Sequence, residues 1–149
     1  MTDSPSAGVI EGREHRLPVR VYYEDTDFTG VVYHANYVRY FERGRSDFLR
    51  LVGVAHAALL ARSDPAAFVV TRLEIDFRRP ARIDDALLVR TTYDRVQGPR
   101  LFVAQRITRG DMVIANAVVE AACIDLQGRP RRPPAGLAEQ LKPYLLPAP

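Results

Sequence analysis

Two aspartates and a glycine turn lead into a histidine in the segment DTDFTGVVYHAN, residues 25–36. A positioned aspartate can attack a carbonyl carbon directly, or it can act as a base that activates water. Asp27 is the carboxylate nearer to the point where a helix is expected to begin. Because a helix amino terminus attracts partial negative charge, this segment could polarise a carbonyl group and cleave an acyl bond beside it.

The backbone of the same segment supplies a second part of such chemistry. Gly30 allows a turn that brings the chain close to a ligand. The N–H groups around Tyr33 and His34 would then donate hydrogen bonds to a carbonyl oxygen, as an oxyanion hole does. Acyl transfer or hydrolysis is therefore the chemistry that these residues favour.

Each candidate residue also has a purely structural interpretation. Aspartates are common in turns and at helix starts, so on spacing alone Asp25 and Asp27 are more often structural than catalytic. A single histidine at a helix start more often packs or forms a hydrogen bond. Glu42 has the position of a solvated helix residue. Cys123 falls on an apolar strand face, so a nucleophilic role is not expected for it.

One long helix is predicted directly after the aspartate pair, in HANYVRYFERGRSDFLRLVGV, residues 34–54. Apolar side chains recur there every three or four positions, which indicates one buried face made by Tyr37, Tyr40, Phe41, Gly44, Phe48 and Leu51. A glycine within a helix lowers its stability by about 1 kcal/mol relative to alanine. The place of Gly44 on the apolar face therefore predicts close approach to a strand.

Five strands are predicted around this helix. The clearest lies within residues 68–77, where alternate positions form one apolar-rich face: Val69, Thr71, Leu73, Ile75 and Phe77. The other four are β-rich runs bounded by turn signals, at residues 17–24, 86–96, 101–108 and 112–125. Such an order predicts an α+β fold in which an antiparallel sheet curls over one helix.

The domain is expected to span residues 17–134, between a flexible segment at 1–16 and a short helix with a tail at 135–149. A single helix covers only one face of a sheet and leaves its edges open. The uncovered face and edges predict a homodimer rather than a monomer.

Composition narrows the possible classes of protein. The chain has 149 residues, 47% of them hydrophobic and 26% charged, as expected for one soluble globular domain. The net charge of +3 comes from dispersed arginines, with no stacking motif or continuous basic helix, so no nucleic-acid partner is predicted. One cysteine and three separated histidines give no zinc spacing. No metal site is therefore expected. The first fifteen residues resemble neither a signal peptide nor a membrane anchor, so a cytoplasmic protein without a membrane span is expected.

Residues 21–49, VYYEDTDFTGVVYHANYVRYFERGRSDFL, resemble the signature of the hotdog-fold acyl-CoA thioesterases of the 4-hydroxybenzoyl-CoA thioesterase type, in particular their Tol–Pal-associated (YbgC-like) branch. The pattern Tyr, two residues, Asp-Thr-Asp, two residues, Gly-Val-Val-Tyr-His, two residues, Tyr is uninterrupted, and the similar order extends over residues 17–134. The resemblance implies a five-stranded antiparallel sheet wrapped around a long central helix. It also implies dimers that join their sheets edge to edge and often pair into homotetramers.

By this resemblance the second aspartate, Asp27, is the catalytic one, and the first is structural. The N–H that polarises the thioester carbonyl belongs to His34, with Gly30 and Tyr33 in the turn before it, and the His34 side chain can orient water or product. Glu42 matches a helical acidic residue that can face the acyl pocket across the subunit interface. The family leaves open whether Asp27 attacks to form a mixed anhydride or acts as a base on water.

The resemblance also assigns surface basic residues near the cleft mouth to the phosphates of coenzyme A. Two clusters are available, in FRRPARIDD and GRPRRPP: Arg78, Arg79, Arg82, Arg129, Arg131 and Arg132. Arginine suits phosphate because its planar fork donates hydrogen bonds in pairs. A solvated basic rim is the structural alternative for each of them.

The sequence therefore predicts an acyl-CoA thioesterase that hydrolyses short-chain or aromatic acyl-CoA to free acid and CoA. No cofactor is expected, since coenzyme A is part of the substrate. The alternative is a non-catalytic module that binds an acyl-CoA or the thioester of an acyl carrier protein. Neither the acyl group nor the choice between CoA and a carrier protein follows from the sequence.

Overall fold

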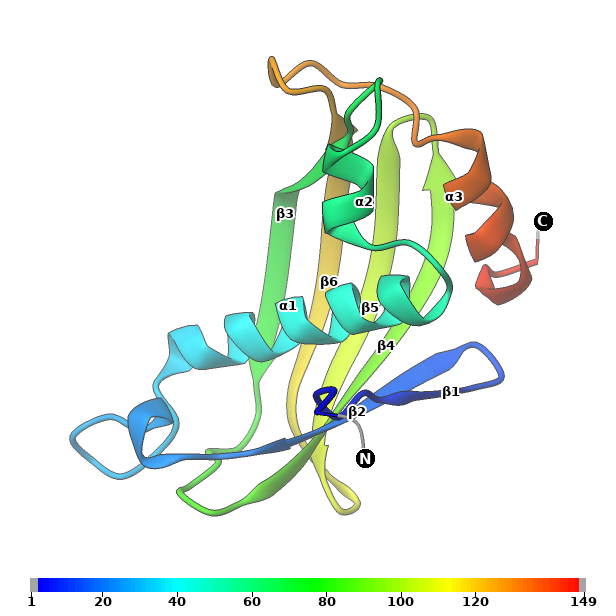
Figure 1. Cartoon of the computed structure of the whole chain (residues 1–149). Helices are drawn as coiled ribbons and strands as arrows, with labels where there is room; N and C mark the ends of the chain where they lie inside the picture. The colour runs from blue at the N-terminus through cyan, green and yellow to red at the C-terminus, as the bar shows by residue number, and fades with distance from the viewer. Residues whose placement is uncertain (1–2, 148–149) are drawn as a thin grey trace.

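A curved antiparallel sheet lies against one long helix in the computed structural model, which describes residues 3–147 (Figure 1). The strands are β1 Val9–Glu11, β2 Glu14–Arg20, β3 Ala67–Phe77, β4 Ala86–Gln97, β5 Arg100–Arg109 and β6 Met112–Ile124. The helices are α1 His34–Leu51, α2 His56–Leu60 and α3 Ala135–Leu141, with single 3-10 turns at Tyr23–Asp25 and Lys142–Tyr144. The predicted α+β class is confirmed.

The six strands pair in the order β1-β2-β4-β5-β6-β3, and every pair is antiparallel. All five predicted strands are present. The sixth, β1, was not predicted because three residues are too few to show an alternating pattern. It pairs with the first residues of β2, which begins at Glu14 rather than Leu17, so part of the segment expected to be flexible is in strands. Residues 1–2 and 148–149 of the two predicted terminal segments lie outside the described residues.

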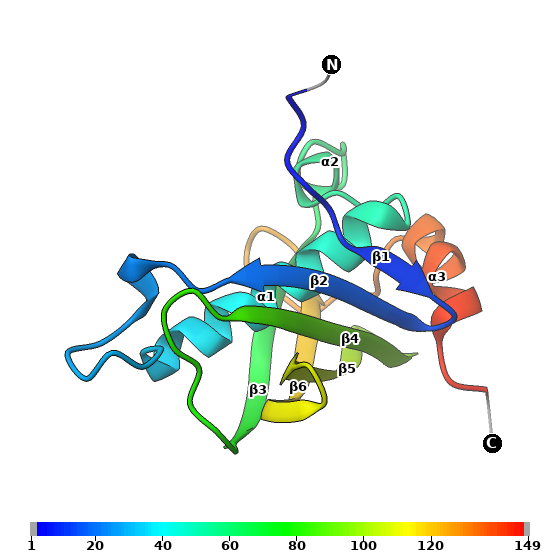
Figure 2. The same ribbon diagram turned by 90° about the horizontal axis from the view of Figure 1, so that it is seen from below.

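Helix α1 crosses the concave face of the sheet, as the two ribbon views show (Figures 1 and 2). Its buried face contains five of the six residues predicted for it: Tyr37, Tyr40, Phe41, Gly44 and Phe48. Leu51 was predicted to be buried, but it is 43% exposed because α1 ends there and the chain turns away. Within the described residues, no helix is both long enough and apolar enough to cross a membrane.

Gly44 marks the closest approach between α1 and the sheet. A Cβ atom at Gly44 would lie 2.8 Å from the Thr91 Oγ1 and 2.9 Å from the Val89 Cγ1, both on β4. Real Cβ contacts are longer than this, so only glycine lets the helix lie so near to the strand. The close approach predicted from the sequence is confirmed.

Strand β3 forms one free edge of the sheet, and its inward-facing residues differ in part from those predicted. Its register with β6 shifts between Val70 and Arg72, where a β-bulge interrupts the pairing. Ile75 packs against the core after the bulge, as expected, but before the bulge Phe68 does so rather than Val69, which is 41% exposed. The predicted alternation therefore holds only for the second half of β3, because an extra residue moves later side chains to the other face.

Candidate active site

The loop between β2 and α1 is folded into a tight turn at the predicted aspartate. The Asp27 N–H donates to the Val31 carbonyl oxygen at 2.8 Å, and the Gly30 N–H donates to the Asp27 carbonyl oxygen at 3.1 Å. Gly30 has a φ of +84°, a conformation that glycine adopts without steric conflict. The Val32 N–H donates to the Ala81 carbonyl oxygen at 2.8 Å, so the loop is attached to the segment that follows β3.

The side chain of Asp27 is exposed, and its two carboxylate oxygens differ in their hydrogen bonds. Its Oδ1 accepts hydrogen bonds from the Thr29 hydroxyl at 2.7 Å and from the Thr29 N–H at 2.8 Å. These bonds, the hydroxyl first, hold the pKa of the Asp27 carboxyl below its ordinary value. Both Thr29 bonds go to Oδ1, which leaves Oδ2 free of them. Asp27 therefore presents one oxygen of an ionised carboxylate to solvent.

Asp25 has the structural part that the sequence analysis assigned to it. Its Oδ2 accepts a 2.8 Å hydrogen bond from the Tyr22 N–H. Its carbonyl oxygen accepts from the Tyr33 N–H at 2.9 Å and from the Asn36 Nδ2 at 2.8 Å. Asp25 thus fixes the chain on both sides of the Asp27 turn.

The amino terminus of α1 offers one of the two N–H groups that were predicted to polarise a carbonyl. The Tyr33 N–H is already bonded to the Asp25 carbonyl oxygen, so the prediction for Tyr33 is corrected. No side chain caps the helix, and no described residue accepts the His34 N–H. Because unpaired N–H groups and the helix dipole attract negative charge, His34 is the backbone donor open to a substrate oxygen.

Aromatic side chains connect the start of α1 to the end of β3. The His34 ring lies 4.6 Å from the Tyr33 ring and contacts Phe77 edge-on at 6.4 Å, between ring centroids. Phe77 also lies 5.7 Å from the Tyr37 ring, whose hydroxyl accepts a 3.0 Å hydrogen bond from the Ala81 N–H. Sequence reasoning missed Phe77 as a site residue, because its only signal was the strand alternation.

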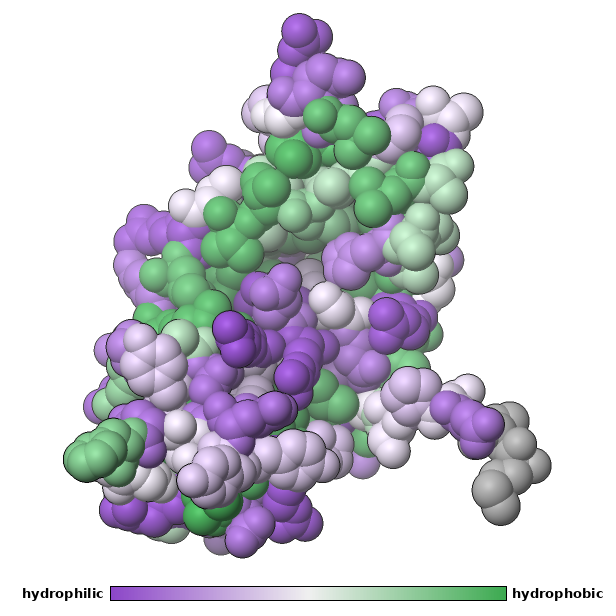
Figure 3. Space-filling model, turned by 60° about the vertical axis from the view of Figure 1, so that its left-hand side comes forward, coloured by the Kyte–Doolittle hydropathy of each residue, from purple (hydrophilic) through white to green (hydrophobic). Residues whose placement is uncertain are grey.

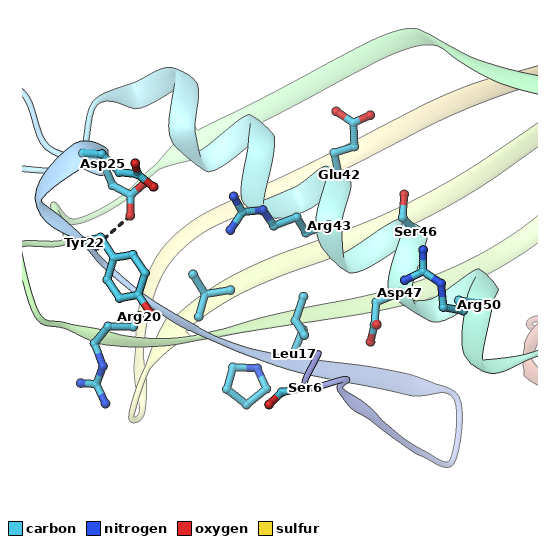
Figure 4. Close-up of a pocket in the computed structure, with 13 residues that line it drawn as sticks. Ser6, Leu17, Arg20, Tyr22, Asp25, Glu42, Arg43, Ser46, Asp47 and Arg50 are labelled. Atoms are coloured by element: carbon cyan, nitrogen blue, oxygen red, sulfur yellow. Dashed lines mark hydrogen bonds between the residues drawn. The ribbon is translucent and has the colours of Figure 1, made fainter. Parts of the chain in front are cut away.

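Glu42 lies on the exposed side of α1, eight residues after His34. At a rise of about 1.5 Å per residue, the two are about 12 Å apart along the helix axis. Glu42 is among the residues that line the groove between α1 and β2 (Figure 4). A single copy of the chain therefore does not bring Glu42 to Asp27.

The first predicted arginine cluster lies beside the site loop. Arg78 and Arg79 directly follow β3, and the backbone of Arg82 pairs with that of Val31 in the loop. All three arginines are exposed. The first cluster therefore lies next to the loop that carries Asp27.

The second cluster, Arg129, Arg131 and Arg132, lies toward the other end of β3. The Arg131 guanidinium bonds the Asp64 carboxylate at 2.8 Å and the Pro65 carbonyl oxygen at 3.4 Å, just before β3 begins. Strand β3 has 11 residues, which corresponds to about 35 Å. One copy of the chain therefore separates the two clusters, and Arg131 is already engaged.

A groove of about 570 Å³ lies between β2 and α1, and it does not include Asp27 (Figure 4). Arg20, Arg43, Arg50 and Asp47 are among its lining residues. Among residues 3–147, no three histidine, cysteine or acidic side chains come together as a metal site. Cys123 is buried, and burial raises the pKa of its thiol, which agrees with the packing role expected for it.

The residues of this site fall within matches to known proteins. A model of the thioesterase-like superfamily matches residues 21–141. The acyl-CoA thioesterase YbgC of Haemophilus influenzae is 45% identical over 110 residues, which cover 74% of this chain and 80% of that protein. The acyl-CoA thioester hydrolase YbgC of Escherichia coli is 41% identical over 129 residues, which cover 85% of this chain and 95% of that protein.

Solved structures share the same architecture. A probable thioesterase from Bartonella henselae has a TM-score of 0.79 and 46% identity, covering 81% of this chain and 99% of that one. A hypothetical protein from Thermus thermophilus has a TM-score of 0.82 and 30% identity, covering 90% and 99%. The sheet around α1 is thus the hotdog fold, which confirms the predicted fold class. The chain belongs to the thioesterase-like superfamily, and the resemblance of residues 21–49 to its YbgC-like branch is confirmed.

Proposed function

We propose that this protein hydrolyses acyl-CoA thioesters and that Asp27 carries the chemistry. The observation that supports this most is that one short segment carries two groups suited to the reaction. One is the ionised Asp27 carboxylate, whose Oδ2 is free of the Thr29 bonds, and the other is the His34 N–H at the start of α1, which no described residue accepts. The thioester carbonyl oxygen would accept a hydrogen bond from the His34 N–H, and the Asp27 Oδ2 would lie toward the carbonyl carbon. The names of the YbgC relatives favour a hydrolase over a binding module.

Two routes use the same carboxylate oxygen. In direct attack, Asp27 displaces the CoA thiolate and forms a mixed anhydride, which water then hydrolyses. In base catalysis, Asp27 removes a proton from a water that attacks the carbonyl carbon, and CoA leaves. In both routes, the developing oxyanion accepts a hydrogen bond from the His34 N–H. An acyl adduct on the Asp27 peptide in rapidly quenched reactions identifies direct attack.

A second copy of the chain completes the site in this proposal. In one copy, Asp27 lies on an exposed loop, and β3 leaves an edge with exposed apolar residues, among them Val69, Leu73 and Phe77. Apolar side chains gather in a band on the side of the molecule that carries β3 (Figure 3). Two identical edge strands related by a twofold axis pair in antiparallel fashion.

The charges of β3 favour one register for this pairing. Arg72 and Glu74 flank Leu73 and form an ion pair within the chain. An antiparallel pair centred on Leu73 would place each Arg72 opposite Glu74 of the second copy, so the edge is self-complementary. The same register brings Phe77 of one copy beside the start of β3 in the other, at Phe68 and Val69. It also brings Arg78 and Arg79 of one copy toward Arg129 and Arg132 of the other. These four arginines could then hold CoA phosphates together.

The proposal is tested by Asp27→Asn, with thiol release from acyl-CoA as the measurement. Removing a positioned base or nucleophile typically lowers turnover by about 10²-fold or more, so a loss of this size is expected. The matched control is Asp111→Asn, an exposed carboxylate in the turn between β5 and β6, which should keep parental activity. Parental turnover in Asp27→Asn, or a parent that binds acyl-CoA without releasing thiol, would overturn the proposal.

A further inference from the structure

A small cavity of about 70 Å³ lies beside α1, against the first half of β3, and shares Glu42 and Ser46 with the lining of the large groove. Most of its wall is apolar: Leu49, Phe68, Val69, Val70, Tyr93, Leu101, Val103 and Ala121. Its polar lining comes from four residues on α1 and α2: Glu42, Arg45, Ser46 and His56. An apolar chamber with one polar side is the usual form of a site that orients a small organic group.

Ser46 and His56 are paired at this polar side. The Ser46 Oγ lies 3.1 Å from the His56 Nε2, which joins α1 to the first residue of α2. The His56 ring meets Phe68 edge-on, with 6.3 Å between ring centroids. Arg45 is turned toward the core instead, where its guanidinium donates to the Gln105 Oε1 at 2.9 Å. The Ser46 hydroxyl and the His56 imidazole are therefore, with the Glu42 carboxylate, the polar groups available to a ligand in the cavity.

The cavity cannot serve the Asp27 of its own chain. Ser46 lies twelve residues beyond His34, about 18 Å along α1, which is longer than a short acyl group. In the antiparallel β3 pair described above, the start of β3 in one copy, at Phe68 and Val69, lies beside Phe77 of the other, and Phe77 contacts His34. The cavity of one copy would then open beside the catalytic loop of its partner copy.

We propose that Ser46 and His56 determine acyl specificity by binding a hydroxyl group at the far end of the acyl chain, an inference that rests on the proposed thioesterase function. A ligand hydroxyl can donate to the Ser46 Oγ, which keeps a lone pair beside its contact with His56, or it can replace that contact and bond the His56 Nε2 itself. At about 15 Å³ for each water-sized group, the cavity holds only a few non-hydrogen atoms. The tip of a short or aromatic acyl group fits, whereas Glu42 disfavours a terminal carboxylate.

The experiment compares two thioesters that differ by a single hydroxyl, phenylacetyl-CoA and 4-hydroxyphenylacetyl-CoA. The parent should favour the hydroxylated ester in kcat/KM by about tenfold or more, because a site built to bond a hydroxyl loses that bond with the other ester. Ser46→Ala and His56→Phe should each reduce this preference to about threefold or less. Both variants should leave phenylacetyl-CoA hydrolysis nearly unchanged, which marks a role in specificity rather than in chemistry.

Controls distinguish this role in specificity from a purely structural one, in which the Ser46–His56 hydrogen bond only holds α2 against α1. Ser46→Thr keeps the hydroxyl and should keep the preference, and Ser63→Ala, an exposed serine after α2, should behave as the parent. An equal fall in activity toward both esters, together with a lower melting temperature, would show the purely structural role and overturn the inference. A parent that hydrolyses both esters equally well overturns this inference alone. A parent that releases thiol from neither ester overturns the proposed function as well.

Discussion

The carboxylate of Asp47 on α1 lies 2.7 Å from the Nε2 of His15 on β2, and the His15 side chain is completely buried. The same oxygen, Oδ2, accepts a 2.8 Å hydrogen bond from the Gly8 N–H. One carboxylate thus fastens both the first strands and the segment before them to the central helix. Because buried polar groups are stable only with hydrogen-bond partners, Asp47, His15 and the Gly8 N–H depend on one another.

Asp47→Ala is expected to lower the free energy of unfolding by about 3 kcal/mol, because it leaves the buried His15 and the Gly8 N–H without an acceptor. Urea unfolding measures the change. The control is Asp111→Ala in the exposed turn after β5, where a change within about 0.5 kcal/mol is expected. Equal stability of the two variants would contradict the structural role of Asp47.

Gly44→Ala should also destabilise the fold, by about 1–3 kcal/mol, because the new methyl group would overlap Thr91 and Val89 on β4. Gly136→Ala is the matched control, since Gly136 is also helical but nothing lies within 4 Å of its added Cβ. There the substitution should leave stability unchanged or raise it by up to about 1 kcal/mol. Thermal unfolding of both variants checks the contrast, and a neutral Gly44→Ala would refute the close approach.

Sequence periodicity was sufficient for the parts of the fold that rest on local pattern. The apolar face of α1 and the close approach at Gly44 follow from spacings of three and four residues. The bulge between Val70 and Arg72 has no such signal, since a bulge is set by pairing with β6. The His15–Asp47 pair was also missed, because 32 residues separate two side chains that each looked solitary in sequence.

The site was predictable to the same extent. The motif located Asp27, the Gly30 turn and the helix start, all within one short segment. It gave no indication that the Tyr33 N–H is bonded to Asp25, because hydrogen bonding across a loop depends on its folded path. For the same reason, the separation of the arginine clusters by the length of β3 became visible only in three dimensions.

Thr29→Val should move the acidic limb of the pH profile of kcat/KM to higher pH. The Thr29 hydroxyl is the main group that lowers the pKa of Asp27, so its loss raises that pKa, and the active carboxylate is then protonated at a higher pH than in the parent. Thr29→Ser keeps the hydroxyl and should leave the acidic limb of the pH profile where it is in the parent. Thr26→Val removes a hydroxyl that bonds the Tyr23 carbonyl oxygen instead, and it should not move the limb either. An unmoved limb in Thr29→Val would show that Asp27 is not the titrating group.

Arg72→Glu should weaken self-association by about tenfold or more, because the new carboxylate would face Glu74 of the second copy twice in each dimer. Sedimentation and thiol release, measured at the same protein concentrations, should fall together. The double variant Arg72→Glu with Glu74→Arg restores opposite charges across the edge, and it should recover both properties. Arg106→Glu changes an exposed arginine on β5, away from the free edge, and is the control. A fully active monomer would contradict the shared site.

The last prediction concerns the phosphates of coenzyme A. Because Arg78 and Arg79 follow β3 beside the loop that carries Asp27, replacing both with alanine should raise KM for acyl-CoA by about tenfold. Their grip on phosphate is similar in the ground and transition states, so kcat should change little. Arg131→Ala should mainly lower stability, since Arg131 already bonds Asp64.

A thioester of the same acid that lacks the nucleotide provides the control substrate for these arginine variants. Its hydrolysis should be unaffected by the double substitution, and the salt dependence of KM seen with acyl-CoA should be absent, because no phosphate is left to be screened. Arg95→Ala alters an arginine that lies over the Phe102 ring on the strands away from β3, and it should keep the parental KM. If the double variant binds acyl-CoA as tightly as the parent does, Arg78 and Arg79 are solvated surface and the phosphates are held elsewhere.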